Sequence, residues 1–486
     1  MLEDKFWHNY IDGQWVAGSA PPINVINPAT GECLCQQAMA NARDVDSAVI
    51  AAKKAHASGQ LTNMRPVERA RIVQAMGQYI AEHTEEIATV LTLEQGKPLW
   101  ESRIEVSGCA RFFEYYGNLA ESLEGQSIPL GHDYMDFTIL EPYGVTAHII
   151  PWNFPFEMAA RSIAPALATG NTCVVKTPEL TPLSSAWLAR AAEAAGLPGG
   201  VLNLICGHGT EAGNALCEHP DVNMIVFTGS VNTGMSVARA AANTVTPVIL
   251  ELGGKSAAIV HSDADLEAFE TDLRYGIFFN AGQICSAMSR VIIHESLYEP
   301  FIEKAVKLAR SISVRPGIEQ QEDGPSMGAM VCEAQRDKAV AMVEKAILQG
   351  AKIATGGKAL NIPGAYMEPT IIVDVRPGME IAQEEVFGPV LTVMSFRHEA
   401  EAIELANSTQ FGLVGGVFTR DLGCATRAAR AVRCGQFFVN EWFAGGVETP
   451  FGGVGKSGYG REKGREALLN YVQTKNIAIR MSGITG

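Results

Sequence analysis

The sequence predicts an α/β fold with two parallel-sheet units and a small additional β element. The first reason is size, because 486 residues with 47% hydrophobic and 19% charged content can bury more than one core. The second is a repeated alternation of short β-rich runs with helical patterns, which is typical of βαβ units. The third is a pair of short alternating strands that belong to neither alternating block.

Charge and cysteine content restrict the expected partners. A formal net charge of −15 argues against nucleic acid, whose binding needs an excess of Lys and Arg, and leaves small molecules and proteins. The N-terminal stretch has no signal-peptide layout and no apolar run is long enough for a membrane span, so we expect a cytoplasmic protein without a membrane partner. Ten scattered cysteines suit a reducing compartment. Cys33 and Cys35 are expected to be two thiols on a strand, and no metal site is expected.

The first predicted unit combines amphipathic helices with a parallel sheet. Residues 44–118 carry apolar residues at helical spacing, which predicts several helices ahead of the sheet. Residues 145–260 then alternate helical stretches with β-rich runs. The expected strands are VTAHII, TCVVK, VLNLI, MIVFTG and PVILEL. We expect the helices to pack on this sheet.

The second predicted unit spans residues 257–455. Its expected strands are SAAIV, SRVIIHE, PTIIVDV, PVLTVMSF, GGVFT and GQFFVN, and its clearest helices are LYEPFIEKAVKLARSI and EAQRDKAVAMVEKAILQG. Two alternating strands lie outside both units, FTILEPY at 137–143 and NIAIRM at 476–481. Unpaired strand edges of this kind commonly pair with another subunit.

One cysteine of the second unit stands in a segment suited to presenting it. Residues 278–290 read FFNAGQICSAMSR and contain Cys285. A nucleophilic thiol must be accessible and partly ionised, and backbone N–H groups directed at the sulfur help with both. The small residues just upstream let the backbone fold closely around an incoming carbonyl. Taken alone, the segment also fits a buried structural cysteine, so the other motifs must decide.

Two further motifs supply groups that a cysteine nucleophile needs. In VILELGGKS, residues 248–256, Glu251 ends a predicted parallel strand, where α/β sheets bind ligands. Its neighbours Leu250 and Leu252 favour a desolvated carboxyl with the raised pKa of a general base, although a surface ion pair is the alternative. In IIPWNFPF, residues 149–156, Asn153 lies between two prolines, so its amide suits an oxyanion donor or a turn-stabilising group.

Several strand-to-helix turns are candidate dinucleotide contacts. In IVFTGSVNTG a strand ends at Gly229 and a helix follows from about Ser230, and a helix N-terminus attracts phosphate. The run GHGTEAG at 207–213, which contains Gly209, resembles the dinucleotide fingerprint, but its last spacing is one residue too long. Lys176 and Glu179 follow another strand, as expected for contacts to a ribose or adenine. Ordinary turns would explain each glycine motif equally well.

The motifs PWNFP, FTGS, LELGGKS, NAGQIC, EEVFGPV and PFGGVGKSGYGRE, in this order, resemble the aldehyde dehydrogenase superfamily. The resemblance extends over essentially the whole chain, from YIDGQWV near the N-terminus to YVQTKN near the C-terminus. It implies a Rossmann-like NAD-binding domain of residues 1–123 and 143–254, and a catalytic domain of residues 255–455. Residues 124–142 and 470–486 would form an oligomerisation element of a homodimer or homotetramer.

The resemblance also implies roles for individual residues. Cys285 would be the nucleophile and Glu251 the general base, and Asn153 with the Cys285 backbone N–H would form the oxyanion hole. The implied cofactor contacts are Lys176 and Glu179 to the adenosine ribose, Ser230 and Trp152 to the pyrophosphate, Glu385 to the nicotinamide ribose and Phe387 beside the ring, with Gly209, Gly229 and Leu252 also in the cofactor site.

These roles imply NAD(P)-dependent oxidation of an aldehyde to its carboxylic acid through a cysteine thiohemiacetal and a thioester. Relatives that transfer the acyl group to coenzyme A lack the glutamate at the position of Glu251, so its presence favours hydrolysis over a CoA-acylating semialdehyde dehydrogenase. A non-catalytic binding protein that retains the fold is the alternative of another class. Glu179 would repel a 2′-phosphate, which favours NAD, while Lys176 leaves NADP possible.

The substrate stays open between two kinds of aldehyde. Arg161 resembles the arginine with which succinate-semialdehyde dehydrogenases contact the substrate carboxylate, but an ion pair with Glu157 on the same helix face fits equally well. Phe156, Phe279, Trp442 and Phe443 could instead line a mouth for an aromatic or ring-bearing aldehyde, although Phe156 and Phe279 also fit a core. Ser162 stands where the family often has a proton-relay lysine, while Glu462 matches the other relay partner.

Overall fold

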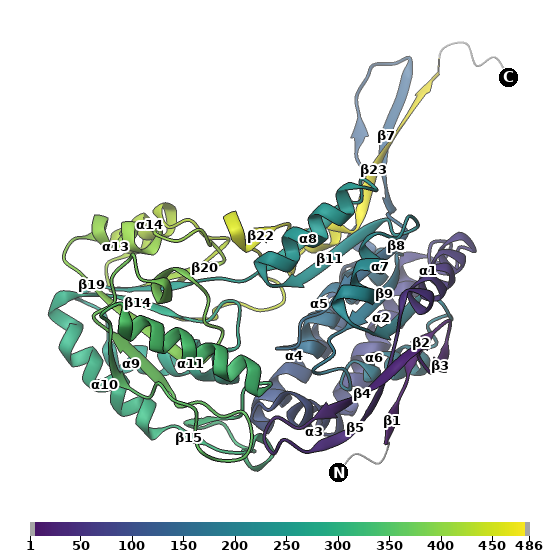
Figure 1. Ribbon diagram of the computed structural model, residues 1–486. Helices are drawn as coiled ribbons and strands as arrows, with labels where there is room; N and C mark the ends of the chain where they lie inside the picture. The colour runs from purple at the N-terminus through teal and green to yellow at the C-terminus, as the bar shows by residue number, and fades with distance from the viewer. Residues whose placement is uncertain (1–4, 482–486) are drawn as a thin grey trace.

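Two α/β lobes and a projecting β-arm make up the structure, a computed structural model in which residues 5–481 are described (Figure 1). The first four residues of the predicted segment 1–123 and the last five of the predicted segment 470–486 therefore lie outside the described residues. The predicted α/β class with two mainly parallel sheets is confirmed. None of the helices within residues 5–481 combines the length and apolar character needed to cross a bilayer.

The sheet of the first lobe has eight strands in the order β22-β12-β11-β8-β9-β10-β2-β3. Its strands are β2 (Asn9–Ile11), β3 (Gln14–Val16), β8 (Val145–Ile149), β9 (Thr172–Thr177), β10 (Leu202–Cys206), β11 (Met224–Gly229), β12 (Val248–Leu252) and β22 (Gly458–Tyr459). The strands β12, β11, β8, β9 and β10 run parallel, whereas β2, β3 and β22 are antiparallel additions at the edges. The strand order reverses at β8, between β9 and β11, and such a switch point is where α/β sheets bind ligands.

Helices cover both faces of this sheet, which is why its central strands are continuous apolar runs. The helices of the lobe are α1 (Ala42–Ala57), α2 (Pro66–Glu82), α3 (Thr84–Gln95), α4 (Leu99–Leu119), α5 (Pro155–Ala168), α6 (Ala186–Ala194), α7 (Asn214–Cys217), α8 (Val231–Ala242) and α15 (Glu466–Asn470). Pro155 occupies the first turn of α5, where a missing N–H leaves no helical bond unmade. The expected helices of residues 44–118 are thus confirmed as α1 to α4.

The sheet of the second lobe has seven strands in the order β17-β18-β19-β14-β13-β20-β21, all parallel except β17. They are β13 (Ala257–Val260), β14 (Arg290–His294), β17 (Lys352–Thr355), β18 (Thr370–Val373), β19 (Val390–Phe396), β20 (Val414–Phe418) and β21 (Gln436–Val439). The covering helices are α9 (Leu266–Leu273), α10 (Tyr298–Ser311), α11 (Glu333–Leu348), α12 (Glu380–Gln383), α13 (Glu399–Ala406) and α14 (Leu422–Ala431). Every strand expected in the second unit is present.

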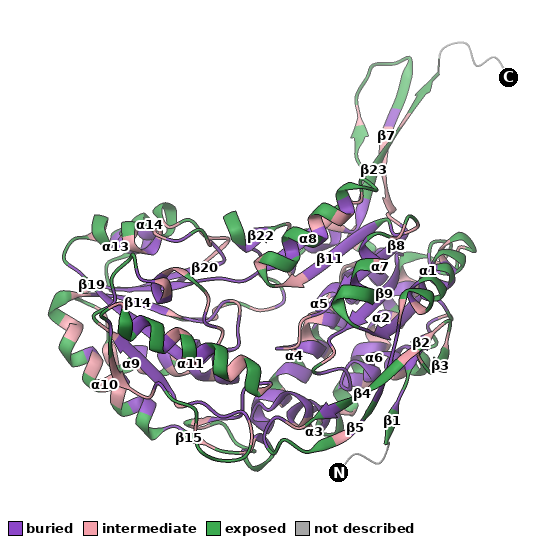
Figure 2. Ribbon diagram, in the orientation of Figure 1, coloured by how far each residue is buried: buried purple, intermediate pink, exposed green. Residues whose placement is uncertain are grey.

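The two strands expected outside both units pair with each other. In the arm, β7 (Tyr134–Pro142) is antiparallel to β23 (Val472–Arg480) along their whole length, and β6 (Ser127–Ile128) joins the other edge of β7. The arm projects from the first lobe, and most of its residues are exposed or half-buried (Figure 2). The two strands are longer than predicted, and one edge of β23 has no strand partner among the described residues.

Two small sheets were not foreseen. Near the N-terminus β1 (Phe6–Trp7), β5 (Cys33–Met39) and β4 (Ala20–Ile26) form a three-stranded sheet, and in the second lobe β15 (Ser313–Val314) pairs with β16 (Ser326–Met327). Cys33 and Cys35 lie on β5, as predicted.

Candidate active site

A cavity of about 1060 Å³ is lined by residues of both lobes. It lies beyond the carboxyl ends of β8 and β11, the point at which the strand order reverses, because its lining includes Trp152 and Asn153 after β8 and Gly229 and Ser230 at the end of β11. Cys285, Glu251 and Asn153 all line it. Three residues from separate segments, predicted to act together, therefore share one cavity.

The loop that carries Cys285 has an unusual backbone. Asn280, Ala281 and Gly282 have φ angles of 49°, 51° and 71°, a left-handed run that non-glycine residues adopt only when their surroundings hold them there. A Cβ atom on Gly282 would lie 2.1 Å from the carbonyl oxygen of Gly388, so only glycine fits at this crossing. The loop is thus tightly fixed, and it places the half-buried Cys285 thiol at the cavity wall.

The electrostatic surroundings of the thiol act in opposite directions. Burial raises the pKa of Cys285 to about 12, the Arg161 guanidinium opposes this shift, and the carboxyl groups of Glu385 and Glu251 add to it. The Ser286 backbone N–H directed at the sulfur lowers the pKa slightly. In this state the thiol is mostly protonated at neutral pH, and Arg161 is the main charge that favours the thiolate.

Glu251, at the end of β12, is almost completely buried, and neither of its carboxyl oxygens accepts a hydrogen bond from a described residue. Burial raises its pKa well above the usual carboxyl range, and the neighbouring Glu462 raises it further. The desolvation expected from Leu250 and Leu252 is confirmed. A Cβ on Gly452 would lie 2.7 Å from Glu251 Oε1, so the C-terminal segment passes directly over the carboxyl group.

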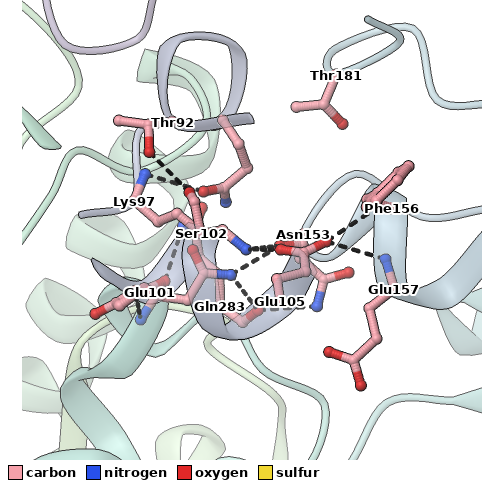
Figure 3. Close-up of polar contacts among 12 residues, drawn as sticks. Thr92, Lys97, Glu101, Ser102, Glu105, Asn153, Phe156, Glu157, Thr181 and Gln283 are labelled. Carbon is pink, nitrogen blue, oxygen red and sulfur yellow. Dashed lines mark hydrogen bonds and ion pairs between the residues drawn. The ribbon is translucent and has the colours of Figure 1, made fainter. Parts of the chain in front are cut away.

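Asn153 is fixed through both its side chain and its backbone. Its Nδ2 donates to the Gln283 carbonyl oxygen over 2.9 Å, and its own carbonyl oxygen accepts from Lys97 Nζ and Asn280 Nδ2, each over 2.9 Å (Figure 3). The first of these bonds uses one of the two amide hydrogens. The second hydrogen is free for an oxygen atom bound in the cavity.

Arg161 pairs with a carboxylate that the sequence did not suggest. Its guanidinium contacts Glu462, both side chains are nearly fully buried, and the guanidinium lies 5.2 Å from the Phe451 ring centroid. The predicted alternative, an ion pair with Glu157, is wrong, because the partner comes from the C-terminal segment that crosses α5. Ser162 bonds the carbonyl oxygen of Ala159 within its own helix.

Of the four aromatic residues assigned to the mouth, Phe279, Trp442 and Phe443 line the cavity and Phe156 does not. Phe156 is fully buried in the helical core of the first lobe, so its assignment is corrected. Helical periodicity explains the difference: on α5 the residues that line the cavity are Glu157, Met158 and Arg161, and Phe156 lies on the opposite face.

The cavity wall also contains aromatic residues that the sequence did not predict there. Phe112, Phe154, Tyr275, Phe438 and Phe451 contribute to the wall. Phe451 belongs to the PFGGVGKSGYGRE motif, which was a usable signal, whereas nothing in the sequence marks the others.

The predicted adenosine contacts lie together at the carboxyl ends of β9 and β10. Glu179 Oε2 accepts from Lys176 Nζ over 3.0 Å, and Glu179 Oε1 accepts from the Gly209 backbone N–H over 2.9 Å. These three residues do not line the cavity, but Trp152, Gly229, Ser230, Leu252, Glu385 and Phe387 do. The predicted cofactor residues therefore form two groups, one after β9 and β10 and the other in the cavity, where residues at the ends of β8, β11 and β12 are joined by Glu385 and Phe387 of the second lobe.

Comparison with known proteins accounts for this arrangement. Residues 15–477 match the aldehyde dehydrogenase family model. The chain belongs to the aldehyde dehydrogenase family. Retinal dehydrogenase 2 of Homo sapiens is 38% identical over 99% of this chain and 93% of its own, and the mitochondrial benzaldehyde dehydrogenase of Antirrhinum majus is 39% identical over 96% and 88%.

Solved aldehyde dehydrogenase structures have the same fold. An aldehyde dehydrogenase variant from Bacillus cereus superposes with a TM-score of 0.96 at 37% identity, covering 98% of this chain and 96% of that one. A variant of betaine aldehyde dehydrogenase from Staphylococcus aureus, in complex with NAD⁺, superposes with a TM-score of 0.95 at 36% identity, covering 98% of each chain. The protein is thus an oxidoreductase acting on aldehydes, and the alternative of a non-catalytic protein is not supported.

The residues of this aldehyde dehydrogenase fit a nicotinamide dinucleotide. Ser230 caps the N-terminus of α8, whose first N–H groups suit a pyrophosphate. Glu385 is anchored by the Gly254 N–H over 3.1 Å, and a Cβ on Gly253 would lie 2.1 Å from Glu385 Oε2, so the backbone approaches this carboxyl as only glycine allows. Phe387, with a positive φ of 57°, packs edge-on against Trp152 at a centroid distance of 5.2 Å.

Proposed function

We propose that this aldehyde dehydrogenase oxidises a neutral, ring-bearing aldehyde to its carboxylic acid with NAD as the preferred acceptor. The observation that carries the proposal is the joint presence of Cys285, Glu251 and Asn153 in one cavity whose wall includes the aromatic side chains of Phe279, Trp442 and Phe443. Each of the three supplies a different function that acyl chemistry needs: a nucleophile, a base and an oxyanion donor.

The chemistry follows from the properties of these groups. The Cys285 thiolate attacks the aldehyde carbon, and the adduct oxygen accepts hydrogen bonds from the free Asn153 amide hydrogen and the Cys285 backbone N–H. Such a donor can be worth about 3 kcal/mol of transition-state stabilisation. The nicotinamide ring, when bound, supplies the hydride acceptor that turns the thiohemiacetal into a thioester. Glu251 then deprotonates the water that releases the acid.

Hydrolysis is favoured over transfer to coenzyme A by the state of Glu251. Its carboxyl group is buried, has a raised pKa and forms no hydrogen bond with a described residue. Both carboxyl oxygens are therefore able to accept a hydrogen bond from a water molecule, as a general base requires. A CoA-acylating enzyme needs no such group. Acid formation without added coenzyme A would separate the two.

The wall chemistry favours a ring. Phe279, Trp442 and Phe443 are joined there by Phe438 and Phe451, and Arg161 is neutralised by Glu462. An arginine already paired with a buried carboxylate is a poor receptor for a second one. Two relatives are named for ring-bearing aldehydes, retinal and benzaldehyde, which supports the same substrate class.

A semialdehyde remains the second candidate because of Lys463. This lysine lines the cavity with its Nζ 5.9 Å from the Phe451 ring centroid, and no described carboxylate forms an ion pair with it. An anionic tail would therefore meet Lys463 and not Arg161.

The preference for NAD rests on Glu179. Its carboxylate is held between Lys176 Nζ and the Gly209 N–H, and its pKa is lowered by Lys176 against the effect of burial. A charged carboxylate accepts from a ribose 2′-hydroxyl and repels a 2′-phosphate. NADP use is then the weaker activity.

The projecting arm is proposed to join subunits of a homodimer or homotetramer. It carries exposed apolar side chains, among them Met135 and Ile479, on strands that leave the body of the protein (Figure 2). Met135→Glu with Ile479→Glu should reduce the mass measured by light scattering to that of a smaller assembly. Leu422→Glu, which changes an exposed leucine of the second lobe, is the control.

The central test is a panel of aldehydes with NAD and NADP, followed by nicotinamide absorbance. Cys285→Ala should abolish turnover and leave NAD binding intact, whereas Cys434→Ala, at another half-buried thiol, should change neither. Benzaldehyde-type substrates should give higher kcat/KM values than succinate semialdehyde. Substantial activity of the Cys285→Ala variant would contradict the mechanism.

A further inference from the structure

A buried polar network connects α4 to the residues around Asn153 (Figure 3). Lys97 lies two residues before α4, Glu101 and Glu105 are spaced four residues apart at its start, and all three are almost inaccessible to solvent. None of the three lines the cavity that contains Cys285. Ionisable groups buried away from the reacting atoms need an explanation.

Lys97 directs its ammonium group at one short segment. Its Nζ donates to Glu105 Oε2 over 2.5 Å and to the Asn153 carbonyl oxygen over 2.9 Å, and it lies 3.9 Å from the centre of the Phe154 ring. These contacts use two of the three N–H donors of the lysine in hydrogen bonds and place its charge over an aromatic ring. Two of them fall on consecutive residues, Asn153 and Phe154.

Glu105 extends the same contacts to the start of α5. Its second oxygen, Oε1, accepts from the backbone N–H groups of Phe156 and Glu157 over 3.1 and 3.2 Å. A carboxylate at a helix N-terminus satisfies N–H groups that have no partner within the helix. The Lys97–Glu105 ion pair therefore fixes the backbone from Asn153 to Glu157.

The catalytic loop reaches Asn153 from the other side. Asn280 Nδ2 donates to the same Asn153 carbonyl oxygen, and the Gln283 carbonyl oxygen accepts from Asn153 Nδ2. Glu101 in turn accepts from the Asn280 backbone N–H over 2.8 Å. Lys97 and the start of α4 thus bind both the segment that begins at Asn153 and the loop that ends at Cys285.

We propose that Lys97 is a positioning residue, which orients the Asn153 amide toward the oxygen of the Cys285 adduct through its bonds to Asn153 and Glu105. This inference rests on the proposed function and adds to it a residue that touches no substrate. A buried ion pair contributes little to stability compared with apolar side chains of the same volume. A displacement of 1 Å in a catalytic group, by contrast, can reduce a rate about a hundredfold.

A double-mutant cycle between Lys97→Met and Asn153→Ala tests the proposal. Asn153→Ala should lower kcat/KM about a hundredfold, as expected for loss of an oxyanion donor. Lys97→Met should lower it at least about tenfold in the wild-type background and less than about twofold in the Asn153→Ala background. A purely structural role would give the same factor in both backgrounds, and that result would overturn the proposal.

A second readout needs no cofactor. With p-nitrophenyl acetate, the Cys285 thiolate attacks the ester carbonyl, the C–O bond breaks, nitrophenolate leaves and a thioester forms, so an oxyanion donor is required. Alkylation of the same thiol by iodoacetamide requires none. Lys97→Met should slow nitrophenolate release and leave the alkylation rate unchanged, and equal losses in both reactions would count against positioning.

Controls separate this proposal from folding and from the proposed function itself. Lys53→Met removes an exposed ion pair with Asp221 and should leave all rates unchanged. If Lys97→Met does not fold, the cycle is run with Lys97→Met/Glu105→Gln, in which the glutamine oxygen can still accept the α5 N–H groups. If Asn153→Ala has no effect on kcat/KM, the oxyanion role of Asn153 in the proposed function is wrong. If Asn153→Ala does lower kcat/KM but Lys97→Met lowers it by the same factor in both backgrounds, only the role of Lys97 is overturned.

Discussion

The guanidinium of Arg161 forms an ion pair with the carboxylate of Glu462 at a point where the two side chains are only 5% and 2% exposed. Arg161 also lowers the pKa values of Cys285 and Glu251, which burial raises. A single guanidinium therefore counters Cys285 and Glu251, which line the cavity, as well as Glu462, with which it is paired. The positive charge of Arg161 is thus already balanced by acidic groups of the protein in the absence of substrate.

Arg161→Leu is expected to slow the oxidation of neutral and anionic aldehydes alike, because the charge that it removes acts on Glu462 and the catalytic groups. It should also lower the melting temperature, since breaking a buried ion pair from one side costs about 3–5 kcal/mol. Adding Glu462→Leu should restore most of the stability. The measurements are KM and kcat on both substrate classes and thermal unfolding. A rise in KM confined to anionic aldehydes would show that Arg161 binds a substrate carboxylate.

The reactivity of Cys285 in the cofactor-free protein should rise steeply with pH. Only the thiolate reacts, and burial raises the thiol pKa to about 12, so iodoacetamide alkylation should accelerate about tenfold per pH unit from pH 7 to 10. Arg161→Leu should slow it at each pH, because loss of the positive charge raises the pKa further. Cys285→Ala identifies the reacting thiol. A rate that levels off below pH 9 would disagree with this environment.

Glu251→Gln should leave thioester formation intact and block its hydrolysis. We expect a burst of NADH close to one equivalent per active site, followed by very slow turnover. Since the base must be deprotonated and its pKa is raised by burial and by Glu462, wild-type turnover should fall as the pH drops through a value above the ordinary carboxyl range. Steady turnover in the variant at near wild-type rates would assign the base elsewhere.

Glu179→Gln should shift the cofactor preference toward NADP. Removing the carboxylate charge frees Lys176 Nζ, now bound to Glu179, for a 2′-phosphate. A change of about tenfold in the NADP to NAD ratio of kcat/KM corresponds to about 1.4 kcal/mol. Glu211→Gln, at an exposed glutamate near Gly209, is the matched control and should leave the ratio unchanged. An unaltered ratio in Glu179→Gln would place the selectivity in other residues.

The sequence was sufficient for features that depend on local order. Glu251 lies at the end of a predicted strand, Asn153 lies between a strand and a helix, and β-rich runs alternating with helices define both sheets. Such signals come from neighbouring residues in the chain. The predicted strands agree with the structure for that reason, whereas the meeting of Cys285, Glu251 and Asn153 at one cavity was expected from the resemblance of their motifs to aldehyde dehydrogenases.

Features that depend on distant segments were beyond the sequence. Glu462 is far from Arg161 in the chain, whereas Glu157 is one turn away, so helical spacing pointed to the wrong partner. Helical spacing places Phe156 and Arg161 on different faces of α5, but it does not show which face packs in the core. Lys97 and Glu105 look like ordinary solvated charges, and only their contacts with Asn153 and α5 reveal that they are buried.

The pairing of β22 with β12 has a consequence for biosynthesis. Gly458 aligns with Glu251, and the segment that follows brings Glu462 to Arg161. A nascent chain that has emerged only through the second lobe therefore holds the thiol and the base but lacks both the strand that pairs with β12 at Glu251 and the carboxylate that pairs with Arg161. We therefore expect the site to be complete only after almost the whole polypeptide has left the ribosome, and a product truncated ahead of Gly458 should be inactive.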